Sequence, residues 1–188
     1  MYISWGKRLF DIFFSILGII ALAPLLVILA ILIYLFDKGP IFFCQERVGK
    51  DKEIFFIFKF RTMPVNTLNL PSSEISDIKI TWIGRLLRRT NFDELPQLFN
   101  ILRNEMSIVG PRPPIASQKE LIQLRVNNGS IKCKPGLTGI AQIYGFDGMS
   151  NEKKANFDEA YSKDLTFFCD LKVILKTFNY LLNPPPKY

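Results

Sequence analysis

The longest apolar run of the chain lies near its N-terminus. Residues 12 to 36, IFFSILGIIALAPLLVILAILIYLF, contain no charged side chain. As a straight helix this run would extend roughly 37 Å at about 1.5 Å per residue, which exceeds the roughly 30 Å hydrocarbon core of a bilayer. Apolar character continues past the one candidate cleavage site, ALA at 21 to 23, so we do not expect a cleaved signal peptide. The pattern predicts a segment that resides in a membrane.

A proline at the centre of this run leaves two topologies open. Pro24 removes one backbone hydrogen bond and its ring meets the carbonyl of Ile20, so we expect a kink. Hydropathy alone favours a kinked helix that spans the bilayer, because membrane helices tolerate proline. Charge favours a helix that breaks at Pro24 and returns to the same face, since bases flank both ends of the run. These bases are Lys7 and Arg8 before it and Lys38, Arg47, Lys50 and Lys52 after it.

The polar part of the chain begins with a predicted β-hairpin over residues 41 to 63. Two apolar and aromatic runs flank a polar turn that contains Gly49. Lys59 and Arg61 alternate with phenylalanines, so both bases would leave one face of the second strand. They could be solvated strand residues or part of a site.

The remaining pattern predicts helices joined by proline-rich and glycine-rich loops. Residues 64 to 79 are polar and are interpreted as a surface loop. Residues 81 to 90 have apolar positions at helical spacing beside three arginines, so this helix could lie on a bilayer or bind phosphate. A helix follows from about 96 to 104, and one or two more are expected over 157 to 182. Between them lie a stiff loop at 107 to 115 and a turn-rich stretch at 134 to 139.

Composition narrows the chemistry. The chain has a formal net charge of +7 and contains no histidine, which excludes Ser-His and Cys-His nucleophiles. Cys44, Cys133 and Cys169 are odd in number and widely spaced, so neither a disulfide framework nor a zinc site is indicated. The excess of bases favours an anionic partner, such as nucleic acid, phospholipid headgroups or a phosphorylated substrate.

Two adjacent acids, Asp93 and Glu94, have a structural and a catalytic interpretation. Asn91 with Glu94 three residues later matches a capping box, and acids are stabilised at a helix N-terminus. Pro96 opposes this, because a proline is best placed at the start of a helix and not in its second turn. The helix would then begin near residue 95 or 96 and leave both acids on its approach.

Arginines on both sides of the acids favour catalysis. Arg85, Arg88 and Arg89 precede them, and Arg103 and Arg112 follow. Transfer of a phosphoryl group to a carboxylate requires cations that offset the phosphate charge, usually with Mg²⁺, and an acid as nucleophile.

Four motifs in order give the chain a specific resemblance. They are KFRTM at 59 to 63, RRTNFDELPQLFNIL at 88 to 102, MSIVGPRPP at 106 to 114 and KPGLTGIAQ at 134 to 142. Together they resemble the monotopic phosphoglycosyl transferases of bacteria, and the similarity runs from Lys7 to about Leu182. With one hydrophobic segment and no further membrane domain, the chain is most similar to the small members, such as those that initiate glycan assembly in Campylobacter and its relatives.

The resemblance implies an activity and roles for named residues. The enzyme would transfer a sugar 1-phosphate from a UDP-sugar to polyprenyl (undecaprenyl) phosphate and release UMP, through a covalent intermediate on Asp93. Glu94 would assist, and Mg²⁺ would be the cofactor, with both acids as its ligands. The product would pass to downstream glycosyltransferases. The residues implied to contact phosphate or nucleotide are Lys59, Arg88, Gln97 and Arg112.

The resemblance also implies a fold and a location. We expect an α+β protein with a re-entrant helix-break-helix over residues 1 to 36 and a small cytosolic α/β catalytic domain with surface amphipathic helices over 37 to 188. It would lie at the cytoplasmic face of the bacterial inner membrane with both termini in the cytoplasm. Lys7, Arg8 and Pro24 would be the membrane-associated residues. Family members often have Ser-Pro at the break, whereas this chain has Ala23-Pro24, so the break would depend on Pro24 alone.

Two other classes of function remain open from the residues alone. A membrane scaffold would account for the apolar segment and the basic surface, but not for adjacent acids between arginines. A nucleic-acid-binding module would account for the charge, but the membrane segment and the lack of a recognition motif count against it. We therefore expect no nucleic-acid partner. The residues do not indicate which UDP-sugar is used.

Overall fold

The structure is a computed structural model that describes residues 2–64, 80–145 and 148–182. The predicted loop at 64 to 79 and the prolines at 184 to 186 lie almost entirely outside these ranges. The chain is α+β, as expected. A helical turn over Tyr2–Gly6 leads into α1 (Lys7–Asp37), and the hairpin of β1 (Phe42–Val48) and β2 (Ile54–Phe60) follows. The later elements are α2 (Trp82–Thr90), α3 (Gln97–Leu102), β3 (Ser107–Val109), α4 (Lys119–Asn127), β4 (Gly136–Thr138), α5 (Ile140–Tyr144), α6 (Asn151–Lys163) and α7 (Phe167–Leu182).

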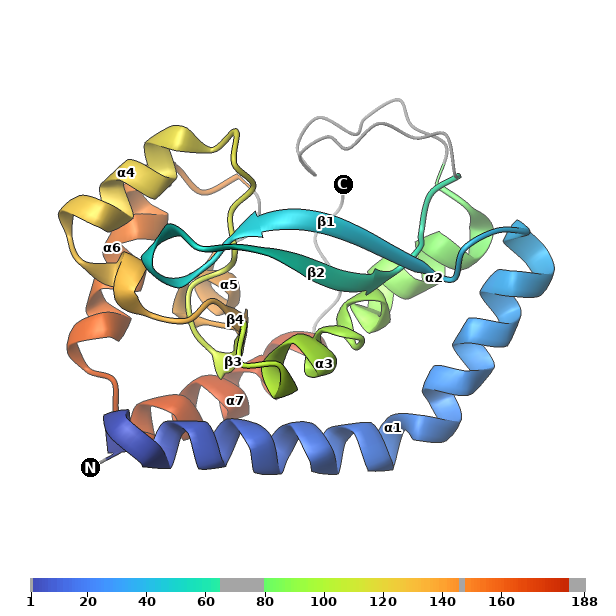
Figure 1. Ribbon diagram of the computed structural model, residues 1–188, viewed down its shortest axis with the longest axis horizontal. Coiled ribbons are helices and arrows are strands. Elements are labelled where there is room, and N and C mark those ends of the chain that lie inside the picture. The colour runs from blue at the N-terminus through green and yellow to red at the C-terminus, as the bar shows by residue number, and fades with distance from the viewer. Residues whose placement is uncertain (1, 65–79, 146–147, 183–188) are drawn as a thin grey trace.

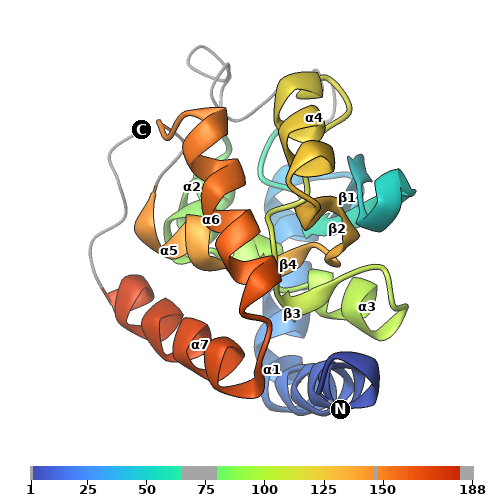
Figure 2. The ribbon, with the colours of Figure 1, turned by 90° about the vertical axis from the view of Figure 1, so that its left-hand side faces the viewer.

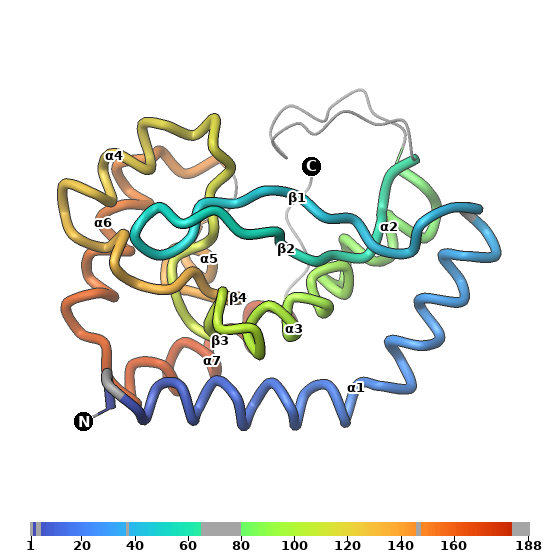
Figure 3. Tube along the Cα trace, in the orientation of Figure 1, coloured from blue at the N-terminus to red at the C-terminus, as the bar shows by residue number. Residues whose placement is uncertain are grey.

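Helix α1 runs without interruption through Pro24. It has 31 residues, and its ribbon lies along one edge of the molecule and then changes direction (Figures 1 and 3). Among the described helices it is the one long and apolar enough to cross a membrane. Only 11% of its most apolar 18-residue stretch is buried, whereas a core helix of a soluble protein is mostly buried. The sequence suggested two half-helices at Pro24, and the structure has one bent helix in their place.

Both sheets are small. β1 and β2 pair antiparallel, with Phe42 opposite Phe60 and Val48 opposite Ile54, which confirms the predicted hairpin. β3 and β4 pair in parallel, although the sequence indicated only loops in these segments. A Cβ atom on Gly136 of β4 would lie 2.1 Å from the backbone nitrogen of Gly110, so a glycine is needed where the two backbones approach.

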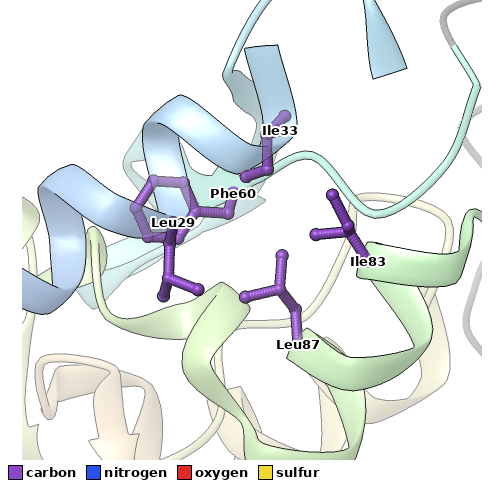
Figure 4. Close-up of a cluster of buried hydrophobic side chains, with 5 residues drawn as sticks. All are labelled: Leu29, Ile33, Phe60, Ile83 and Leu87. Carbon is purple, nitrogen blue, oxygen red and sulfur yellow. The ribbon is translucent and has the colours of Figure 1, made fainter. Parts of the chain in front are cut away.

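Apolar side chains from both parts of α1 pack against the rest of the protein. In its C-terminal part, Leu29 and Ile33 contact the hairpin and α2 through Phe60, Ile83 and Leu87 (Figure 4). Nearer the N-terminus, Ile19 packs on a second cluster that includes residues of β2 and α3. Helix α7 lies beside the start of α1, where ring contacts join them (Figure 2). One small body therefore holds α1 on both sides of its bend.

Candidate active site

The two adjacent acids lie in a tight turn between α2 and α3. Asn91 ends α2 in the left-handed conformation at φ 56°, and its side chain makes no capping hydrogen bond. Phe92–Glu94 form a short 3₁₀ turn, and α3 begins at Gln97 directly after Pro96. The capping-box interpretation is therefore wrong, and the prediction that the helix starts just past the acids is confirmed to within two residues.

Glu94 pairs with two bases from distant parts of the chain. The Nζ atom of Lys59, in β2, lies 2.7 Å from Oε1 of Glu94. The Nη2 atom of Arg112, in the loop after β3, lies 3.0 Å from the same oxygen. Lys59 is therefore not a solvated strand residue. The hairpin, the 3₁₀ turn and the proline-rich loop meet at one carboxylate.

The two acids differ in their electrostatics. Burial raises the pKa of Asp93 to about 6, and the charge of Glu94 adds to this shift, while Lys59 opposes it. Burial also opposes the charged form of Glu94, but Arg112 and Lys59 outweigh it and hold the pKa of Glu94 well below its usual range. Glu94 thus stays ionised and accepts from Lys59 and Arg112. In the described part of the chain, no residue donates a hydrogen bond to the Asp93 carboxylate.

Arg88 and Gln97 lie close to the acids but face inward. The Nε atom of Arg88 donates to Oγ1 of Thr62 at 3.0 Å, and the Arg88 charge lowers the pKa of Asp93. Gln97 is buried, and its Nε2 has no hydrogen-bond partner in the described part of the chain. A buried amide without a partner is costly unless a ligand or water accepts from it. The structure thus brings all six predicted site residues into one region.

A cleft of about 440 Å³ opens beside this region. Two of the predicted residues, Glu94 and Arg112, line it. Its wall also includes apolar side chains of α7, among them Ile174 and Phe178. The cleft therefore has charged groups and apolar surface, which suits an amphipathic ligand.

Sequence reasoning missed two arginines of this cleft, Arg47 and Arg125. Burial lowers the pKa of Arg47 to about 10, and repulsion from Arg112 adds to the effect. In the sequence Arg47 is one of several bases that flank the apolar segment, and Arg125 lies in a helix with no motif around it. Only the folded chain brings them to the cleft, where the hairpin and α4 pack beside the proline-rich loop.

The N-terminal bases Lys7 and Arg8 have partners within the protein. The Nζ atom of Lys7 lies 2.7 Å from Oδ2 of Asp170 in α7. Arg8 donates to the carbonyls of Ile101 and Leu102 at 2.6 and 2.8 Å, where it satisfies the free carbonyls at the end of α3. Both bases are mainly partners of the folded domain.

The acids also provide ligands suited to a magnesium ion. No group of three or more His, Cys, Asp or Glu side chains gathers within the described ranges, so a cage built from protein alone is not indicated. Mg²⁺ commonly uses one or two carboxylates and completes its shell with waters and substrate phosphates. Asp93 and Glu94 fit that pattern.

The three cysteines, Cys44, Cys133 and Cys169, are free thiols.

Comparison with known proteins gives a consistent result. The family described as bacterial sugar transferase matches residues 2–184. A UDP-glucose:undecaprenyl-phosphate glucose-1-phosphate transferase of Klebsiella pneumoniae is 38% identical over 180 residues, covering 91% of this chain and 39% of that protein. An undecaprenyl-phosphate galactose phosphotransferase of Salmonella typhimurium is 33% identical over 199 residues, covering 97% of this chain and 41% of that protein. The exopolysaccharide production protein ExoY of Sinorhizobium fredii is 35% identical over 189 residues, which span 92% of this chain and 83% of ExoY.

Proposed function

The chain belongs to the bacterial sugar transferase family, and from this premise we propose that it transfers a sugar 1-phosphate from a UDP-sugar to a polyprenyl phosphate. The observation that carries the proposal is the carboxylate pair beside the cleft: Glu94 lines the cleft and is fixed by Lys59 and Arg112, and Asp93 precedes it in the same tight turn. The relatives that match over about two fifths of their length are named for transfer of glucose or galactose phosphate to undecaprenyl phosphate. A hexose donor and an undecaprenyl acceptor are therefore the first pair to test.

The proposed reaction has two steps with Asp93 as nucleophile. A carboxylate oxygen of Asp93 attacks the β-phosphorus of the UDP-sugar, and the bond to the bridging oxygen breaks as UMP leaves with the electron pair. A phosphate oxygen of the polyprenyl phosphate then attacks the same phosphorus and displaces the Asp93 carboxylate. The product is a polyprenyl diphosphate sugar, and Asp93 is regenerated without net proton transfer to the enzyme.

The surrounding charges suit this chemistry. Near neutral pH most of Asp93 is ionised, because its pKa is raised only to about 6, and no described partner competes for its lone pairs. Lys59, Arg88 and Arg112 place positive charge where the transferring phosphate would gather negative charge. Glu94 pairs with both Lys59 and Arg112, and its negative charge offsets the repulsion between the two bases. When bound, Mg²⁺ held by Asp93 and Glu94 would neutralise further phosphate charge.

We also propose that α1 enters one leaflet from the cytoplasmic face and returns to that face. A straight helix of its length would extend about 46 Å, enough to place its ends on opposite sides of a bilayer. Arg8 at one end is bonded to α3, and Leu29 and Ile33 near the other end pack on α2 and the hairpin. Because one small domain holds both parts, a bent helix with both ends on one side is favoured.

The reaction is tested by incubating the detergent-solubilised protein with Mg²⁺, undecaprenyl phosphate and each member of a panel of UDP-sugars. We expect UMP release from at least one donor, beginning with UDP-glucose and UDP-galactose, and a lipid-linked sugar product. Glycosyl transfer that releases UDP would contradict phosphosugar transfer. Absence of both UMP and product across the whole panel would reject the proposed activity.

A further inference from the structure

The loop that presents Arg112 is held by its carbonyl groups. Pro111, Pro113 and Pro114 have no backbone N–H, so the loop has few donors with which to fix itself. Four consecutive carbonyls, from Pro111 to Pro114, each accept a hydrogen bond from the surrounding protein. The donors are Gly136 N to Pro111 at 2.9 Å, Arg125 Nη1 to Arg112 at 2.9 Å, Arg47 Nη1 to Pro113 at 3.0 Å and Val48 N to Pro114 at 2.9 Å.

Arg125 is the donor that reaches the carbonyl of Arg112 itself. It projects from α4, is 3% exposed, and uses its guanidinium in two directions. Nε and Nη2 lie 2.8 and 2.7 Å from Oδ2 of Asp158 in α6, while Nη1 donates to the Arg112 carbonyl. Helices α4 and α6 lie side by side in Figure 2, so two helices fix the direction of this guanidinium.

Stability alone does not call for this arrangement. Burial of Asp158 opposes its charge and raises its pKa, and Arg125 offsets part of that cost. Buried ion pairs can often be replaced by apolar residues without loss of stability, because desolvation consumes the coulombic gain. A buried guanidinium that donates to a loop carbonyl does provide fixed geometry, which a flexible apolar contact would not.

We propose that Arg125 is a positioning residue, which Asp158 orients and which holds the backbone of Arg112 so that the Arg112 side chain stays against Glu94 at the cleft. All three nitrogens of the Arg125 guanidinium are committed to protein acceptors, so its effect on the reaction passes through Arg112. The inference rests on the proposed function, because the reaction is where a displaced Arg112 would have its effect.

A double-mutant cycle tests this directly. Arg125→Met, Arg112→Ala and the double variant are made in the full chain and assayed for UMP release. We expect Arg125→Met to lower kcat/KM about tenfold to a hundredfold in the wild-type background, and no more than about twofold once Arg112 is absent. Equal losses in both backgrounds would overturn the proposal, because a residue that contacts substrate itself would act independently of Arg112.

The matched control is Asn128→Ala, which breaks the bond from Asn128 Nδ2 to the carbonyl of Ala155 at 2.9 Å and the bond from the Ser130 N–H to Asn128 Oδ1 at 3.0 Å. It also weakens the α4–α6 contact but does not touch the loop, so its loss of activity should be small and the same in both backgrounds. If Arg125→Met does not fold, Arg125→Lys replaces it in the cycle. Lysine keeps the charge beside Asp158 but lacks the planar fork that donates in two directions.

Hydrogen exchange separates this proposal from the proposed function. In the same variants, peptides that cover residues 106 to 118 should exchange at least tenfold faster in Arg125→Met than in Asn128→Ala. Unchanged exchange in Arg125→Met would reject the positioning role whatever the activity. If the wild type releases no UMP but exchange of these peptides is still faster in Arg125→Met than in Asn128→Ala, the proposed reaction is rejected and the positioning role of Arg125 is retained.

Discussion

At the scale of single residues, two bases, Lys59 and Arg112, share Oε1 of Glu94. Lys59 and Arg112 are 53 positions apart in the sequence, and neither would be assigned to this carboxylate from spacing alone. The motifs indicated which residues belong to the site, and Pro96 indicated that the acids precede α3. The sequence could not reveal that Lys59 points inward, because a strand exposes either face according to what packs on it.

Lys59→Met tests the shared carboxylate. Removal of the ammonium leaves Glu94 with Arg112 as its remaining partner and removes a positive charge near Asp93, so we expect UMP release to fall by about a hundredfold or more. The matched control is Lys50→Met, because Lys50 lies in the hairpin turn with its side chain half exposed. We expect that variant to stay within about twofold of wild type. Similar losses in both would remove Lys59 from the site.

At the scale of elements, the pattern of apolar and polar residues predicted the longer helices and strands correctly. The hairpin and α2 follow their patterns, and the uninterrupted apolar run corresponds to α1. The parallel pair β3–β4 escaped prediction because three-residue strands carry too few positions to show an alternation. Such a pair depends on the close backbone approach at Gly110 and Gly136, which only the folded chain displays.

The proline of α1 gives a prediction at this scale. In Pro24→Ala the regained N–H permits a straighter helix, so Leu29 and Ile33 should pack less well on α2 and the hairpin. We expect a lower unfolding midpoint in detergent and impaired UMP release.

Topology is measured with tags at both termini of the wild type in spheroplasts, using a reagent that does not cross the membrane. We expect neither terminus to be labelled until the cells are opened. Labelling of one terminus in intact spheroplasts would show a spanning helix and contradict the re-entrant topology.

For the Pro24→Ala variant, retention of full activity would show that the bend of α1 is not needed for the reaction.

At the scale of the whole molecule, a buried polar network joins the start of α1 to the start of α7. Asp170 of α7 is fully buried and accepts from the hydroxyl groups of Tyr2 and Tyr161, and it pairs with Lys7. Asp11 of α1 accepts from Ser107 and from the backbone N–H of Ile108 in β3, just before the loop that presents Arg112. Helix α1 is thereby tied to the strand that leads to the site.

Lys7 and Asp170 should be strongly coupled in stability. Lys7→Met leaves the buried charge of Asp170 without its ion-pair partner, which costs roughly 3–5 kcal/mol in typical buried pairs. Asp170→Asn leaves Lys7 with only the longer contact to Asp11 at 3.4 Å. We expect each single variant to lower the thermal unfolding midpoint in detergent markedly, and the double variant to lower it by clearly less than the two effects together. Additive losses would show that the pair is not coupled.

The proposed covalent step at Asp93 is tested by measuring the intact mass of the protein. The enzyme is mixed with Mg²⁺ and its UDP-sugar in the absence of polyprenyl phosphate. We predict a burst of UMP that does not exceed one per enzyme, a mass increase equal to one sugar phosphate less one water, and a modified peptide that contains Asp93. Asp93→Asn should show none of these. Turnover by Asp93→Asn, or an adduct on another residue, would contradict Asp93 as the nucleophile.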